Sequence, residues 1–123
     1  MKRGQGLVEF ALVLPVLLLI ICVVIDGGRL VYAYSTVAEA ARYGAHEAQI
    51  SSSSLAQVDD QVNIHRGLLG DLGTATTLSP SSSPRTPGTS VTITVSYSYR
   101  MITPLLSAFG PVNLTQSTSV TVE

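Results

Sequence analysis

The stretch that decides the fold is LVEFALVLPVLLLIICVVI, residues 7–25, an apolar run interrupted by a single carboxylate, Glu9. At about 1.5 Å per helical residue the run would be about 28 Å long, close to the hydrocarbon thickness of a bilayer. It therefore predicts a membrane-spanning helix. Lys2 and Arg3 precede the run, and short basic segments stay in the cytoplasm. We therefore predict a single pass, with the N-terminus inside and the chain after Asp26 outside.

The charge of Glu9 needs an explanation. An ionised side chain near the centre of a membrane costs about 2.5–3.5 kcal/mol on insertion scales, although a position near the end of the span can relieve much of this cost by snorkelling. The charge alone leaves two interpretations open, an interfacial acid and a functional carboxylate. The residues around Glu9 favour the second.

Glu9 lies in the segment KRGQGLVEFAL, residues 2–12. This segment resembles the signal of type IV pilins, in particular those of the Flp and TadE-like group. The resemblance implies that a prepilin peptidase cuts between Gly4 and Gln5, so that residues 1–4 form a leader and Glu9 and Phe10 become the fifth and sixth residues of the mature chain. Gly4 suits such a cut because glycine readily adopts unusual backbone angles. A second register, with the cut after Gly6, would make Glu9 the third residue and depart from the family pattern.

The resemblance also implies a role in assembly for Glu9 and Phe10. Cleavage would create a new α-ammonium group at Gln5, and the family's carboxylate pairs with the N-terminus of a neighbouring subunit. An unpaired buried charge is costly and a paired one is less so, so the pair selects the correct axial stagger between subunits. Glu9 would then determine the axial register between subunits more than the strength of their association.

Three further segments resemble TadE-like proteins: FALVLP at 10–15, DGGR at 26–29 and AARYGA at 40–45. Together with the leader they cover about the first 50 residues. Pro15 lacks an amide hydrogen and would loosen the span. Gly27 and Gly28 each weaken a helix by roughly 1 kcal/mol. We predict hinges at these three positions, with an ordinary interfacial stop at the glycines as the alternative.

After the span, the helix is predicted to continue to Ile50, so that a helix of residues 5–50 includes the transmembrane run 7–25. Apolar residues recur at three- and four-residue intervals and predict a stripe that needs a partner. They are Leu30, Tyr34, Val37, Ala38, Ala41, Ala45 and Ala48. Ala40, Gly44 and Ala48 form a row of small residues that permits close backbone approach. We favour packing of this row against the chain's own sheet, with the helix of another subunit as the alternative.

Residues 51–123 are predicted to form a small exposed α+β head domain. Ser54 and Gln57 have the capping-box spacing, which predicts a helix from Leu55 to Leu69. Alternation predicts strands at 90–101 and 113–122, with a weaker strand at 74–78, an exposed Ser/Pro loop at 79–88 and a helical turn at 104–109. The predicted fold is α+β and pilin-like, with the long N-terminal helix packed on a small antiparallel sheet.

The sequence shows no residue pattern for catalysis, metal binding or a cofactor. His46 and His65 lack metal-ligand spacing, and the acids Asp59, Asp60 and Asp71 lack the other ligands of a calcium loop. The only cysteine, Cys22, lies in the span, so no intramolecular disulfide can form. A net charge of −1 gives no electrostatic case for nucleic-acid binding.

The resemblance implies a structural subunit of a Tad/Flp type IV pilus, located in the bacterial cytoplasmic membrane and then in the extracellular filament. The implied partners are other pilin subunits, the prepilin peptidase, the platform proteins and the assembly ATPase. The alternative is an uncleaved, membrane-anchored assembly or adhesion module. An ordinary secretory signal is disfavoured because the run is long, Glu9 interrupts it early and no small-residue cleavage site follows closely.

Overall fold

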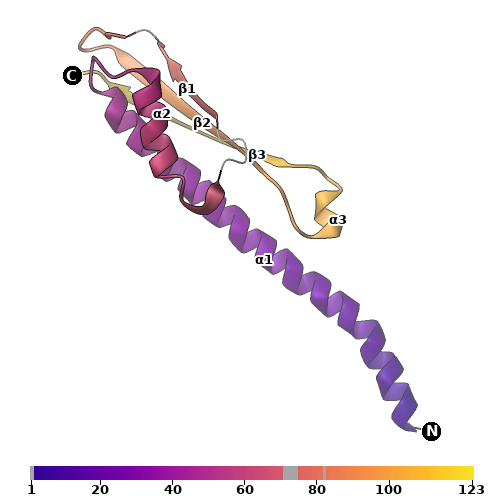
Figure 1. Cartoon of the computed structure of the whole chain (residues 1–123). Coiled ribbons are helices and arrows are strands. Elements are labelled where there is room, and N and C mark those ends of the chain that lie inside the picture. Colours follow the sequence, from indigo (N-terminus) through magenta and orange to yellow (C-terminus); the bar gives the residue numbers. More distant parts are fainter. Residues whose placement is uncertain (1, 71–74, 82) are drawn as a thin grey trace.

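The computed structural model describes residues 2–70, 75–81 and 83–123, and it divides into a long helix and a head (Figure 1). Helix α1 (Lys2–Ala48) is 47 residues long and continuous. Its N-terminal half projects away from the rest of the molecule, whereas the head lies along its C-terminal half (Figure 1). The predicted continuation of the helix beyond the apolar run is therefore confirmed.

In the residues that the structure describes, the head consists of an antiparallel sheet and short helical segments. Their bounds are α2 (Leu55–Ile64), η1 (Gly67–Leu69), β1 (Ala75–Ser79), β2 (Ser90–Tyr99), α3 (Pro104–Ser107) and β3 (Val112–Thr121). The strands are antiparallel in the order β1-β2-β3. The predicted α+β fold, a long helix packed on a small antiparallel sheet, is confirmed.

The second helix is shorter than predicted. Its capping box is present, since the Gln57 amide donates to Ser54 Oγ and the Ser54 amide donates to Gln57 Oε1. The α-helix ends at Ile64 instead of Leu69: the cap residue His65 has left the helical conformation, with φ at −97° and ψ at 5°, and Gly67 then takes the left-handed conformation, with φ at 56°. The chain continues as the single 3₁₀ turn η1.

The core lies between α1 and the sheet. Alternate residues of β2 point toward α1 and are buried, as its alternating pattern predicted: Val91, Ile93, Val95, Tyr97 and Tyr99. The small residues of α1 meet them: Ala33, Val37, Ala40, Ala41, Ala45 and Ala48. Tyr34 was predicted in this stripe but is exposed. The covered face includes Ala33, and Tyr34 lies about 100° around the helix from it.

Gly44 is the point of closest approach between α1 and α2. A Cβ added there would lie 2.6 Å from Val62 Cγ2, and Val58 and Ile93 are the next neighbours. Ala40 and Ala48 are buried on the same face. The row of small residues therefore packs within the chain, as we favoured, although its nearest neighbours at Gly44 belong to α2 and only then to the sheet.

The loop between β1 and β2 is not wholly exposed, in contrast to the prediction for residues 79–88. Arg85 is only 4% exposed. Its Nη1 donates to the carbonyls of Ala48 and Ile50 and to Ser53 Oγ, and its amide donates to the Ser51 carbonyl. The last carbonyls of a helix lack partners within the helix, and a basic side chain satisfies them and complements the helix dipole. Arg85 thereby ties this loop to the end of α1.

Candidate functional site

The apolar half of α1 is uncovered. Every side chain from Leu7 to Ile25 is exposed except that of Cys22, which is half-buried. The helix is long and apolar enough to cross a membrane, with a mean hydropathy of 3.1 in its most apolar window, and none of that window is buried. The core helix of a soluble domain would be covered by its own chain. This half of α1 therefore needs lipid or other proteins around it.

The residues predicted for processing and register lie at the start of α1. Gly4, Gln5, Glu9 and Phe10 are all helical and exposed. Gln5 and Glu9 are four positions apart and so share a face of the helix. The cleavage between Gly4 and Gln5 and the roles of Glu9 and Phe10 stay predictions.

The predicted hinge residues lie within the continuous helix. Pro15 is inside α1, and the helix passes through Gly27 and Gly28 without ending. A Cβ added at either glycine would meet nothing within 4 Å. Packing therefore does not require glycine at these two positions, and the hinge function stays a prediction.

Asp26 forms the polar junction between the helix and the head. It is the first residue beyond the apolar run and is only 3% exposed. Its carboxylate accepts hydrogen bonds from the amides of Ile102 and Thr103, at 3.0 and 2.7 Å, and from the Tyr99 hydroxyl at 3.3 Å. These donors belong to the end of β2 and the segment that follows it. The junction therefore docks the connection between β2 and β3 onto α1.

The same contacts stabilise the ionised form of Asp26. Thr103 contributes most to holding its pKa down to about 2, through its side chain and its amide, and the Ile102 amide adds to the effect. The Thr103 hydroxyl is buried beside the carboxylate but lacks hydrogen-bond geometry, so the two amides and Tyr99 are the bonds that define the junction. Burial raises the pKa of Tyr99, which keeps its hydroxyl protonated as a donor.

Arg29 completes the junction from the solvent side. Its Nη1 lies 3.3 Å from Asp26 Oδ1, so the two residues form an ion pair one helical turn apart. The guanidinium also lies 5.5 Å from the centre of the Tyr99 ring. The docking of residues 99–103 was not predicted, because no local pattern joins Asp26 to amides on a distant segment. The one signal in the sequence was an acid directly after an apolar run. Its carboxylate can accept more hydrogen bonds than a pair with Arg29 alone supplies.

The other polar candidates lie in ordinary structural surroundings. His65 stacks on Tyr43, with 3.6 Å between the ring centres, and His46 Nδ1 lies 3.0 Å from Gln49 Oε1. Asp59 accepts a hydrogen bond from Asn63, and Asp71 lies outside the described residues. Among residues 2–70, 75–81 and 83–123, no group of three or more His, Cys, Asp or Glu side chains could hold a metal ion.

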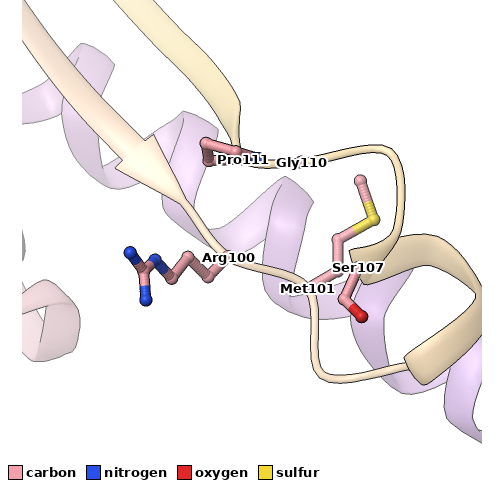
Figure 2. A pocket seen from close by; sticks show the side chains of 5 residues that line it. All are labelled: Arg100, Met101, Ser107, Gly110 and Pro111. Atoms are coloured by element: carbon pink, nitrogen blue, oxygen red, sulfur yellow. The ribbon is translucent and has the colours of Figure 1, made fainter.

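Beyond Asp26, the segment of residues 100–111, which we call the β2–β3 turn, carries two open hollows. One has a volume of 340 Å³ and is lined by Arg100, Met101, Ser107, Gly110 and Pro111. Figure 2 shows Met101 and Ser107 within the bend of this turn, whereas Arg100 points away from it. The other hollow, of 540 Å³, lies between the turn and Arg29. Neither contains a set of side chains that suggests catalysis.

Comparison with known proteins assigns the helix but not the head. The family model described as TadE-like protein matches residues 4–46. This range includes the uncovered apolar half, Asp26 with Arg29, and most of the half that the head covers. No curated protein and no solved structure matched the chain. The resemblance noted from the N-terminal segments is therefore confirmed over α1, while residues 51–123 lie outside the match.

Proposed function

We propose that this chain is a structural, pilin-like subunit of a Tad/Flp type IV pilus, because the TadE-like family model matches residues 4–46. The observation that carries the proposal is the division of α1 into two halves. Residues 7–25 are uncovered and apolar, whereas the half after Asp26 is packed under the chain's own head. Such a molecule can be stored in a membrane and then transferred into a filament.

The transfer follows from how the apolar half is solvated. In the bilayer, lipid covers residues 7–25. Outside the bilayer the same side chains would be exposed to water, which is strongly unfavourable. The helix can leave the membrane only if other apolar helices replace the lipid around it. Packing of the N-terminal helices of several pilin subunits provides that replacement.

Processing in this proposal takes place between Gly4 and Gln5. Both residues are helical in the structure, so the prepilin peptidase would have to unwind the first turn of α1. Gly4 and Gly6 lower the cost of unwinding, because glycine in a helix is less favourable than alanine by roughly 1 kcal/mol. The new α-ammonium of Gln5 would then pair with Glu9 of a neighbouring subunit and set the stagger.

The remaining partners are those that a filament subunit requires: the membrane, the platform proteins and, indirectly, the assembly ATPase. The topology is N-in and C-out in the cytoplasmic membrane, with the head outside. The role is structural and not enzymatic. The proposal assigns no cofactor and no nucleic-acid partner.

A second candidate function is an uncleaved, membrane-anchored assembly or adhesion module. The polar junction favours it, because Asp26 binds the β2–β3 turn at the exit of the apolar run and so holds the head beside the membrane. A subunit that never leaves the bilayer would use that arrangement permanently.

The experiment that separates the two is the intact mass and N-terminal sequence of the protein recovered from native cells. Membranes and sheared surface material are measured separately. A chain that starts at Gln5 in the sheared fraction supports a processed filament subunit. A chain that starts at Gln5 in membranes alone indicates a minor or initiating pilin. An intact N-terminus confined to membranes would contradict processing and favour the anchored module.

A further inference from the structure

After Arg100, the β2–β3 turn exposes large apolar side chains with no charged residue among them. Residues 101–112 read MITPLLSAFGPV and contain no acidic or basic residue. Ile102 is 64% exposed, Leu105 59% and Phe109 83%. Such a cluster on the surface of a head that is otherwise rich in serine and threonine indicates a contact surface.

The position of this turn is set by the polar junction. The amides of Ile102 and Thr103 bind Asp26, which directly follows the apolar run. Figure 1 shows the turn with α3 as the part of the head that lies nearest to the N-terminal half of α1. Cys22, one helical turn before Asp26, is the one partly covered side chain between Leu7 and Ile25. The turn therefore lies at the level where α1 enters the membrane.

The backbone of the turn is suited to a region with little water. The amides of Ile102 and Thr103 donate to Asp26, and four others donate within the turn itself. These four bonds are Leu106 to Thr103, Ser107 to Thr103, Phe109 to Leu106, and Gly110 to Ser107. Amide groups without partners are expensive in lipid, and these six have partners.

Two arginines flank the apolar cluster. Arg29 is partly exposed above the junction, and Arg100 is exposed at the end of β2. Basic side chains at this depth are attracted to lipid phosphates, and aromatic and apolar side chains between them enter the headgroup region. The apolar side chains lie toward the span and the arginines lie next to them. This is the order of the acyl chains and the phosphates at a bilayer surface.

We propose that the β2–β3 turn inserts Ile102, Leu105 and Phe109 into the outer leaflet beside α1, with Arg29 and Arg100 at the lipid phosphates. Lipid is the favoured occupant because the apolar run of the same chain brings the turn to the bilayer surface. The inference rests on the membrane-spanning part of the proposed function and does not depend on processing or pilus assembly. It holds the head at a fixed position on the outer surface of the membrane.

The test uses tryptophan as a reporter of depth, because the chain has no tryptophan of its own. Full-length Phe109→Trp is placed in vesicles of phosphatidylethanolamine and phosphatidylglycerol, with and without acyl chains brominated near the headgroup. Leu105→Trp serves as a second reporter of the turn. Leu17→Trp reports on the span, with lipids brominated deep in the chain.

Ile50→Trp is the matched control for the turn. Ile50 is 51% exposed, comparable to Leu105, but it lies beyond the C-terminal end of α1. That end is about 33 Å from Asp26 along the helix axis, at about 1.5 Å per residue. Because all these positions on the head are exposed, the variants should unfold at the temperature of the unmodified chain.

We expect brominated lipid to remove most of the emission of Phe109→Trp and Leu105→Trp and to leave Ile50→Trp unchanged. If Leu17→Trp is quenched while both turn reporters are not, the span stands and this inference is wrong. If Leu17→Trp is not quenched either, the membrane-spanning helix is wrong as well. A blue-shifted turn reporter that brominated lipid does not quench, and whose shift grows with the protein-to-lipid ratio, would show that a second copy covers the turn and would also overturn the inference.

Discussion

The amide of Thr103 donates a hydrogen bond of 2.7 Å to the carboxylate of Asp26, which lies 77 positions earlier in the chain. This bond joins the end of the apolar run to the segment that follows β2. Together with the apolar core between α1 and the sheet, it holds the head at its position along α1. The junction is therefore the structural link between the part of the chain that resembles TadE-like proteins and the part that does not.

The first prediction concerns the Asp26 carboxylate. Asp26→Asn leaves one acceptor oxygen and places an NH₂ donor against the amide donors of Ile102 and Thr103. We expect the midpoint of thermal unfolding of the head, measured by circular dichroism in detergent, to fall by several degrees. Asp60→Asn changes an exposed acid on α2 and should have no such effect. Equal midpoints for the two variants would show that the junction contributes nothing to stability.

The second prediction concerns the pH dependence of this contribution. The pKa of Asp26 is lowered from 3.8 to about 2 by its hydrogen bonds in the folded chain. A lowered folded-state pKa gives stability that is complete above the unfolded pKa and is lost as the pH falls through the folded value. The difference in unfolding midpoint between the unmodified chain and Asp26→Asn should therefore shrink between about pH 4 and pH 2. A difference that stays constant over this range would contradict the assignment.

The third prediction concerns the close approach at Gly44. Gly44→Ala places a methyl group against Val62 Cγ2, and overpacking of this kind costs about 1–3 kcal/mol of unfolding free energy. In the Val62→Ala background the same change should cost clearly less, because the clashing methyl is gone. Gly28→Ala, which meets no neighbour within 4 Å, is the control in the same helix. Denaturant unfolding gives all of these values, and an undiminished cost in the Val62→Ala background would rule out the steric explanation.

The fourth prediction concerns the buried arginine. Arg85→Met keeps the length of the side chain but removes the donors to the carbonyls of Ala48 and Ile50. We expect a loss of about 1–3 kcal/mol of unfolding free energy, since the buried carbonyls would lose their partners. The same substitution at the exposed Arg42 should change little. If the two variants have equal stability, the contact with the end of α1 is energetically neutral.

The fifth prediction concerns the register carboxylate. Glu9→Gln keeps the shape of the side chain and removes the charge, so insertion into the membrane should be undiminished. Filament assembly should fall strongly, because the α-ammonium of Gln5 in a neighbouring subunit would lose its partner. The yield of the protein in sheared surface material, relative to that in membranes, measures the effect. Glu39→Gln, an exposed acid farther along α1, is the control. Filament yields equal to that of the unmodified chain would place Glu9 at the interface without a role in register.

Features encoded by neighbouring residues were predictable. The apolar run and the small-residue pattern after it specified a helix that continues past the membrane, and α1 does so. The capping box at Ser54 and Gln57 specified the start of α2. The alternation in residues 90–101 and 113–122 specified two long strands, of which β2 has a buried face and β3 a half-buried one. Each of these patterns acts through side chains within a few positions of one another, where backbone geometry alone determines which of them share a face.

Features that depend on residues far apart were not predictable. The pattern of α1 placed Tyr34 in the buried stripe, but the head covers a face centred elsewhere. Arg85 was placed in an exposed loop, yet the loop folds back on the end of α1. The junction at Asp26 requires β2 to pack against α1, so that the amides of Ile102 and Thr103 just after the strand reach one carboxylate.

Residues 7–25 and the segments around them were sufficient, as a linear pattern, to specify a helix long and apolar enough to span a membrane and the family it resembles. Hydrophobic length and helical periodicity are local properties, and both can be recognised in the sequence without knowledge of the tertiary structure. Packing of the head decided which face of α1 is buried, where the β2–β3 turn lies and which groups donate hydrogen bonds to the Asp26 carboxylate. Buried polar groups must find partners wherever the chain brings them, and that pairing exists only once distant segments have come together.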